Sequence, residues 1–176
     1  MTIKKLVNKI HSSNFQGCFS ITGGGMKIIE YLFTTPGTSK TILEILIPYS
    51  KNSLSDFLSD ALDSHVSHVE AINMAEKSYL RSKTLSRNSN TFGISCTAAI
   101  STNRLRRGDN RAYIAWRSEF SKGYTSVIFQ KNRRTRQEED IIISKIILNT
   151  ISKIIGINEY LKIKLYESEK LEEHNI

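Results

Sequence analysis

Apolar residues recur at two different spacings along the chain. Runs of strand length, rich in β-branched and aromatic residues, predict strands at Phe15–Ile21, Ile42–Pro48, Thr91–Ala98, Arg111–Ser118 and Gly123–Gln130. Apolar residues three and four positions apart, which fall on one helix face, predict helices at Thr2–Ser12, Met26–Phe33, Ser53–Leu62, Ser67–Leu85 and Arg133–Ile155. Elements in this order indicate an α/β fold, a three-layer α/β/α sandwich with a mixed sheet.

Turn and cap residues mark several boundaries. Capping boxes are predicted at two helix starts, Ser67 with Glu70 and Thr135 with Glu138, and Gly156 is a natural helix end. The turn Glu119–Lys122 is expected to join the last two predicted strands in an antiparallel hairpin. We therefore predict one domain over residues 1–158, followed by a charged, partly ordered C-terminal tail over residues 159–176.

The stretch from Phe15 to Ser50 combines strand, glycine turn, helix and second strand. Backbone N–H groups at Gly23, Gly24 and Gly25, together with the positive end of the helix dipole, favour an anion such as phosphate. A purely structural turn is the alternative, since glycine also serves tight turns and close packing. A crossover between two parallel strands brings their carboxyl ends to one edge of the sheet, so Thr22 and Tyr49 are expected to lie near one another at the edge where ligands bind.

Composition narrows the class of protein. A chain of 176 residues with 39% hydrophobic side chains is large enough for one domain with a real core. No apolar run approaches the roughly 20 residues that span a bilayer, and the first residues lack a secretory signal, so we expect a cytoplasmic protein that does not enter membranes. Cys18 and Cys96 both fall within apolar strand patterns and are expected to be buried free thiols.

Charge is concentrated in the middle of the chain. The net charge is +8, and the segment from Arg81 to Arg136 holds thirteen basic residues against two acids. This balance is compatible with a phosphorylated small-molecule ligand, with nucleic acid, or with solubility alone. Because aromatic-plus-basic motifs of single-strand binders are not evident, we place the phosphorylated ligand above nucleic acid. His65 and His68 lack acidic or thiol partners at metal-ligand spacing and are interpreted as surface residues, so no metal and no cofactor are predicted.

Several short motifs occur in an order and at spacings that resemble one family. They are Ser20, Thr22, Gly23 and Gly24 in an S-x-T-G-G turn, Gly37 and Ser39 in a G-S-S turn, Tyr49 with Ser50, Val66 with Ser67, Met74 with Ala75, and Gly93 with Ser95. In this pattern the chain resembles the carboxy-terminal domain of the CinA proteins, which also stands alone as nicotinamide mononucleotide amidohydrolase. The resemblance runs from about Phe15 to the last predicted helix.

The resemblance implies hydrolysis of the carboxamide of a nicotinamide nucleotide. Ser39 would be the nucleophile, Tyr49 would orient it or relay its proton, and a lysine after the Y-S pair would be the base. Here Leu54 stands at the expected lysine position and Lys51 lies three residues earlier, so activity is expected to be weakened or lost unless Lys51 takes over.

Two functions therefore stay open, a candidate C–N hydrolase and a catalytically inactive nucleotide-binding or regulatory domain; nucleic-acid binding rests on charge alone. The candidate catalytic residues are Ser39, Tyr49 and Lys51. The candidate substrate-binding residues are Ser20, Thr22, Gly23, Gly24, Gly25, Thr38, Ser50, Arg104, Arg107 and Arg111. We also expect a homo-oligomer.

Overall fold

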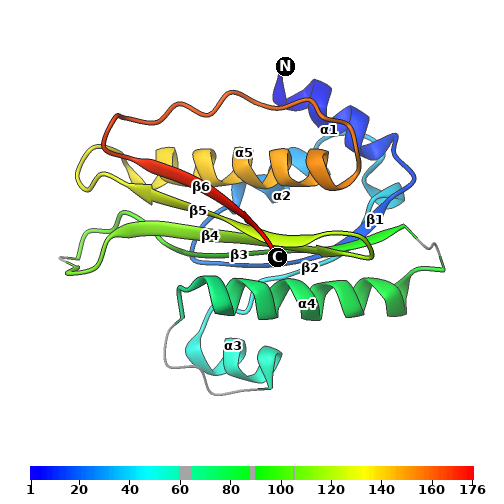
Figure 1. The fold of residues 1–176 in the computed structure, drawn as a ribbon, viewed down its shortest axis with the longest axis horizontal. Helices are drawn as coiled ribbons and strands as arrows, with labels where there is room; N and C mark the ends of the chain where they lie inside the picture. The colour runs from blue at the N-terminus through cyan, green and yellow to red at the C-terminus, as the bar shows by residue number, and fades with distance from the viewer. Residues whose placement is uncertain (60–64, 88–89, 105) are drawn as a thin grey trace.

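A six-stranded mixed sheet forms the middle of the molecule in a computed structural model that describes residues 1–59, 65–87, 90–104 and 106–176 (Figure 1). Its strand order is β2-β1-β3-β4-β5-β6. β1 runs parallel to β2 and β3, and the remaining neighbours are antiparallel. The strands are β1 Gln16–Thr22, β2 Ile42–Leu46, β3 Thr91–Ala99, β4 Asn110–Ser118, β5 Lys122–Phe129 and β6 Lys170–Asn175.

Helices cover both faces of this sheet, as Figure 1 shows. α1, α2 and α5 lie on one face, α4 lies on the other, and α3 packs outside α4. Their bounds are α1 Ile3–His11, α2 Lys27–Phe33, α3 Lys51–Leu58, α4 His68–Leu85 and α5 Arg136–Ile154, with a short 3-10 helix, η1, at Thr38–Lys40. The predicted three-layer α/β/α sandwich is confirmed. The last residues of the helix predicted at Ser53–Leu62 lie outside the described part of the chain.

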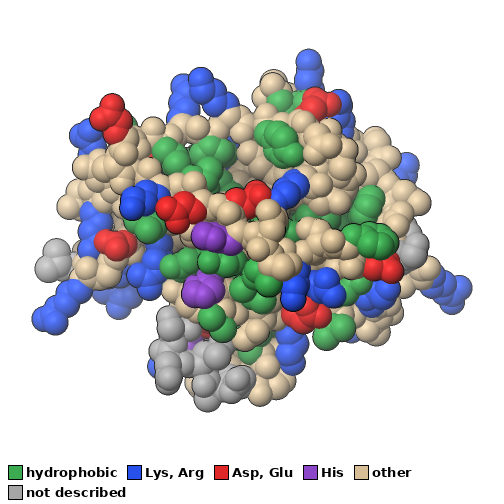
Figure 2. All heavy atoms as spheres, viewed as in Figure 1, with side chains coloured by type: hydrophobic (Ala, Val, Ile, Leu, Met, Phe, Trp, Pro, Cys, Tyr) green, Lys and Arg blue, Asp and Glu red, His purple; other side chains and the backbone are tan. Residues whose placement is uncertain are grey.

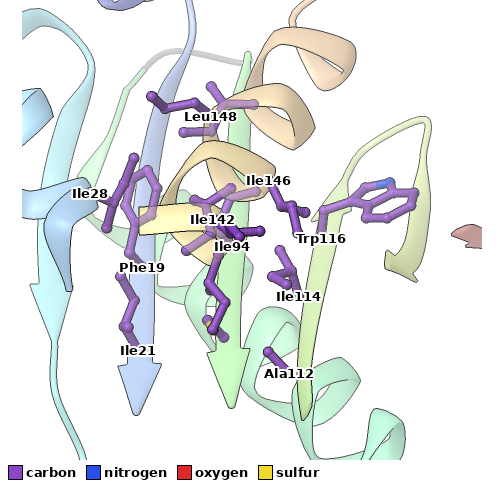
Figure 3. Close-up of a cluster of buried hydrophobic side chains, with 14 of the residues drawn as sticks. Phe19, Ile21, Ile28, Ile94, Ala112, Ile114, Trp116, Ile142, Ile146 and Leu148 are labelled. Carbon is purple, nitrogen blue, oxygen red and sulfur yellow. The ribbon is translucent and has the colours of Figure 1, made fainter. Parts of the chain in front are cut away.

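The larger half of the core lies between the sheet and α5. Phe19, Ile94 and Trp116 point from β1, β3 and β4 toward α5, where they meet a row of isoleucines that includes Ile142 and Ile146 (Figure 3). On the opposite face, small residues let α4 approach the sheet closely. A Cβ at Gly93 would lie 2.2 Å from the backbone nitrogen of Tyr79 on α4, so only glycine fits there. The sheet is thereby held rigidly between its two helical layers.

The C-terminal segment differs from its prediction. Residues 159–176, expected as a charged, partly ordered tail, cross over α5 and return as β6 at the edge of the sheet. Leu161, Ile163 and Leu165 pack on the main core at every second position, and Glu169 is buried in an ion pair with Arg134. The prediction was wrong because these alternating apolar residues are diluted by charged neighbours that face solvent.

Of the two predicted capping boxes, one is complete. At the start of α5, Thr135 and Glu138 each bond to the backbone of the other. At the start of α4, the Ser67 hydroxyl accepts a hydrogen bond of 3.2 Å from the Glu70 N–H, but the Glu70 carboxylate does not return it. That side chain is instead turned into the protein and is 1% exposed.

Two further sequence predictions concern cysteines and membranes. Cys18 and Cys96 are both buried free thiols, as expected, and burial raises the pKa of Cys18 to about 12, which makes it a poor nucleophile. Among the described residues, no helix has both the length and the apolar character to cross a bilayer.

Candidate functional site

The carboxyl ends of β1 and β2 meet at one edge of the sheet, as predicted. There Thr22, at the end of β1, and Tyr49, just after β2, line one cavity of about 260 Å³. Its other lining residues are Gly23, Ser50, Lys51, Leu54, His65, Val66, Thr97 and Ala98. We call this space the edge cavity. It brings together Thr22, Gly23, Tyr49, Ser50 and Lys51 of the sequence-predicted site.

The start of α3 positions Lys51 at this cavity. Ser50 is the N-cap of α3, and its hydroxyl accepts a hydrogen bond of 3.1 Å from the Ser53 N–H, which fixes the first turn. Lys51 is exposed at that turn, whereas Leu54, one turn later, is buried against Met74 of α4. The position that the family resemblance assigns to a lysine is therefore an apolar anchor for α3.

Two more hollows continue from the edge cavity along the same edge. Tyr49 also lines a space of about 520 Å³ with Ser101, Thr102, Asn103 and Arg136. Ser101, Thr102 and Asn103 in turn line a third space of about 310 Å³ with Arg104, Arg106, Asn110, Lys131 and Asn132. We call these three adjacent spaces, which share lining residues, the basic groove. Among its described lining residues none is acidic. Figure 2 shows Lys and Arg side chains at the left end of the molecule, as well as elsewhere around its outline.

Arg136, in the first turn of α5, donates hydrogen bonds to two segments beside the basic groove. One terminal nitrogen of its guanidinium donates to the Gly23 carbonyl at 3.0 Å, and the other donates to the Ser101 carbonyl at 3.2 Å. The side chain thus links the glycine turn to the loop after β3. Sequence reasoning placed Arg136 only among the basic residues of the middle of the chain, because its partners are far away in sequence.

Close packing requires glycine in the glycine turn. A Cβ at Gly23, which has φ of +80°, would lie 1.8 Å from the Ala98 carbonyl oxygen, and one at Gly25 would lie 2.8 Å from Ile147. The N–H groups of Met26 and Lys27 at the start of α2 lack partners within the helix, but they donate to the Asp140 carboxylate at 3.0 and 2.9 Å. These two N–H groups are therefore not available to a phosphate, which favours the structural alternative for the glycine turn.

Ser39 and Thr38 lie at the other edge of the sheet. They form η1, which precedes β2, and β2 runs parallel to β1 toward the edge cavity. Five residues of strand separate the two edges by roughly 16 Å. The Thr38 hydroxyl donates to the carbonyls of Leu32 and Thr35, and Ser39 is exposed. Within one chain, the structure does not bring Ser39 together with Tyr49 and Lys51.

The remaining predicted residues are spread over several places. Ser20 is fully buried beneath α4, where its hydroxyl donates to the Met74 carbonyl, so it is a structural residue. Arg104 lines the basic groove, whereas Arg107 is exposed and is not among its lining residues. Arg111 on β4 donates to the Val66 carbonyl at 3.2 Å, beside the edge cavity.

Solved structures with the same architecture are bacterial competence/damage-inducible proteins. The protein CihA of Agrobacterium tumefaciens aligns with a TM-score of 0.65 at 16% identity, over 89% of this chain and 96% of that one. A CinA superfamily protein of Escherichia coli gives 0.68 at 14% identity, over 87% and 90%. The competence damage-inducible protein A of Klebsiella pneumoniae gives 0.71 at 10% identity, over 90% and 100%. The chain has the fold of the CinA superfamily.

No family model matches the sequence, and no curated protein matches it. The TM-scores of 0.65 to 0.71 establish the CinA fold, whereas identities of 10 to 16% to these three structures leave the substrate and the reaction to be argued from the site itself.

Within this CinA fold, sequence reasoning missed a polar pair at the edge cavity, formed by the half-buried His65 and the buried Glu70. His65 lines the cavity, and its Nδ1 lies 3.6 Å from Oε1 of Glu70. Within the described part of the chain, neither ring nitrogen of His65 and neither carboxylate oxygen of Glu70 has a hydrogen-bond partner, and burial raises the pKa of Glu70 to about 7. One signal was present: Glu70 stands four residues before Met74, in a row that continues through Ser78 and faces the sheet.

These side chains do not make a metal centre by themselves. Over the described ranges, no group of three or more His, Cys, Asp or Glu side chains is arranged to hold a metal ion. The chemistry that the basic groove offers is hydrogen bonding by hydroxyls, stacking on Tyr49, and attraction of anions by Lys51 and the arginines.

Proposed function

We propose that this chain binds a phosphorylated small molecule of the nucleotide class in the basic groove, and that it is a binding or regulatory domain rather than a serine amidohydrolase. The observation that carries the proposal is the row of three adjacent spaces at the carboxyl edge, with cations in each and no acidic lining among the described residues. Such a lining favours an anionic ligand, and this edge of an α/β sheet is where ligands bind.

The size and chemistry of the groove fit a nucleotide. Its three spaces, of about 260, 520 and 310 Å³, fall near the range of small-molecule sites. The Tyr49 side chain lies between two of them and is 68% exposed, so its ring is available for stacking on a heterocycle. Arg136 and Arg104 offer planar guanidinium groups to phosphate oxygens on one side of Tyr49, and Lys51 offers an ammonium group on the other.

Hydrolysis of a nicotinamide nucleotide, which the family resemblance implies, has weaker support. A serine nucleophile needs a neighbouring base, and in one chain Ser39 lies at the opposite edge from Lys51 and Tyr49. The position expected to hold the base is the buried Leu54. These placements favour ligand binding without serine-based turnover.

Calorimetric titration tests the proposal. Nicotinamide mononucleotide and adenosine monophosphate are each compared with the corresponding nucleoside, and we expect the nucleotide to bind at least about tenfold more tightly because of its phosphate. Lys51→Ala, at the edge cavity, should remove most of this difference. Arg87→Ala is the matched control, since Arg87 is exposed just after α4 and does not line the groove.

Two further arms separate the alternatives. Ammonia release from nicotinamide mononucleotide should not exceed that of the Ser39→Ala variant. A duplex of mixed sequence should bind weakly and with steep salt dependence. Equal affinity for nucleotides and nucleosides, or none for either, would refute the proposed function.

A further inference from the structure

The His65–Glu70 pair combines burial, close approach and unused hydrogen-bonding capacity. The Glu70 side chain is 1% exposed, and its carboxylate has no hydrogen-bond partner among the residues that the structure describes, while His65 Nδ1 lies 3.6 Å away. His65 forms part of the wall of the edge cavity, so the pair connects the buried carboxylate to the ligand space. A buried carboxylate without a partner is costly, and natural proteins keep such a group mostly at functional sites.

We propose that the edge cavity binds a tetrahedral dianion, a phosphate or sulfate group, and that the His65–Glu70 pair couples this binding to the uptake of a proton. The proposal rests on the proposed function and assigns one phosphate subsite within the basic groove.

The surroundings of the cavity favour an anion. The cavity lies between the N-terminal ends of α3 and α4, whose first turns begin at Lys51 and His68. Helix N-termini carry partial positive charge, and Lys51 adds a full one. Hydroxyl groups of Thr22 and Ser50 line the same space and suit the oxygens of a tetrahedral anion.

The charge on Glu70 makes the attraction of an anion depend on pH. When Glu70 is ionised and His65 is neutral, the pair has a negative charge behind the cavity wall, and this charge repels the anion through a poorly screened interior. One proton on the pair cancels the charge, and a second makes it positive. The pKa of Glu70, raised to about 7 by burial, places the first change near neutral pH. An anion entering the cavity should therefore draw a proton onto the pair.

Other charged groups around the pair do not produce the same effect. Lys51 on α3 and Arg111 on β4 bring positive charge to this region, and Tyr49 and Tyr113 bring phenol groups. His68 on α4 is exposed and stacks on Tyr124, 5.2 Å between ring centroids, outside the edge cavity. The proton dependence therefore belongs to His65 and Glu70, and His68→Gln provides the matched control.

The test is titration of the full chain with inorganic sulfate, whose own charge is constant between about pH 6 and about pH 8. Wild-type affinity should fall about tenfold over this range, and calorimetry in two buffers of different ionisation enthalpy should show proton uptake at the upper end. Glu70→Gln should match wild type near pH 6 and bind sulfate about fivefold more tightly than wild type near pH 8. His65→Gln should lose affinity near pH 6, and His68→Gln should behave as wild type.

The tightening in Glu70→Gln is the decisive readout, because a merely structural role for Glu70 would weaken binding at both pH values. Wild-type affinity independent of pH, or a Glu70→Gln variant no tighter than wild type near pH 8, would overturn the inference, as would the absence of sulfate binding throughout. Nucleotide binding that persists in any of those cases would leave the proposed function standing. Proton-coupled sulfate binding without nucleotide binding would refute the proposed function and leave the anion site at the edge cavity standing.

Discussion

Asp140 of α5 caps the start of α2 by accepting a hydrogen bond of 3.0 Å from the Met26 N–H. Its second carboxylate oxygen accepts the next N–H, that of Lys27, at 2.9 Å. The contact joins the glycine turn to the long helix of the final third of the chain, and it neutralises the helix end that would otherwise attract a phosphate. The glycine-rich turn of this CinA fold is thus a structural junction, and the ligand space lies beside it.

Asp140→Ala should destabilise the protein by about 1–2 kcal/mol, because two N–H groups lose a charged acceptor at a helix start. Asp140→Asn should cost less, since it keeps one acceptor oxygen. Urea denaturation measures both, with Glu119→Ala, at an exposed turn position, as control. Nucleotide affinity should stay unchanged in all three. A fully stable Asp140→Ala variant would show that the cap has no energetic role.

Gly23→Ala should be severely destabilising. The added Cβ would lie 1.8 Å from the Ala98 carbonyl oxygen, and the backbone has φ of +80°, so neither the space nor the conformation admits a side chain. We expect a loss of more than about 2 kcal/mol in urea denaturation. Gly108→Ala is the matched control, since its nearest neighbour would be an Arg111 nitrogen 3.9 Å away. Similar stabilities for the two variants would contradict this account of the turn.

Ser39→Ala should leave nucleotide affinity within about twofold of wild type, because Ser39 lies at the edge of the sheet opposite the basic groove. Lys51→Ala should weaken binding about fivefold or more, since a phosphate loses a charged partner. Lys40→Ala, next to Ser39, controls for the loss of one positive charge. Calorimetric titration compares the three. If Ser39→Ala weakened binding as strongly as Lys51→Ala, Ser39 would have to reach the ligand, for example from a second copy of the chain.

The layers of the fold could be predicted from the sequence because its strands and helices are long and are buried on regular faces. β3 shows no interruption by polar turn residues, and Thr135 with Glu138 marks the start of α5 locally. β6 gives no such signal, since all its residues are exposed and an edge strand requires little apolar alternation. Its attachment depends on backbone pairing with β5 and on the segment before it.

The site was harder to predict because its key contacts join distant residues. Asp140 lies 114 residues from Met26, and no local pattern links them. Glu70 fitted a capping box in sequence, but the face that it shares with Met74 turns its carboxylate inward. Thr22 and Tyr49 were placed correctly, because a parallel crossover fixes where both strands end. Ser39 precedes β2, so the crossover rule implies that it lies at the opposite edge, whereas the family resemblance implies a place beside Tyr49.

Glu169→Ala should cost about 3 kcal/mol, because Glu169 is buried with Arg134 and its removal leaves an unpaired buried cation. The carboxylate also accepts hydrogen bonds from the backbone of Gln130, at 3.1 Å, and of Tyr166, at 2.8 Å. Glu173→Ala, at the exposed pair with Lys153, should cost less than about 1 kcal/mol. Equal losses in urea denaturation would mean that the C-terminal segment is held by β6 alone.

Glu70→Gln should change how stability depends on pH. Burial raises the pKa of Glu70 from 4.5 to about 7, so between these values the folded chain keeps a proton that the unfolded chain releases. The contribution of Glu70 to stability is therefore fully present below about pH 4.5 and is lost as the pH rises through about 7. Glutamine does not ionise, so the variant should not show this decrease of stability with rising pH.

Relative to wild type, Glu70→Gln should become more stable as the pH rises from about 4.5 to about 8, by at most about 3 kcal/mol. Urea denaturation at several pH values measures the difference, and Glu167→Gln, at an exposed position, should run parallel to wild type. A Glu70→Gln curve that also ran parallel to wild type would show that Glu70 ionises as easily in the folded chain as in the unfolded one. His65 would then have to stabilise the carboxylate fully as an imidazolium, and the pair would lose no stability on ionisation near neutral pH.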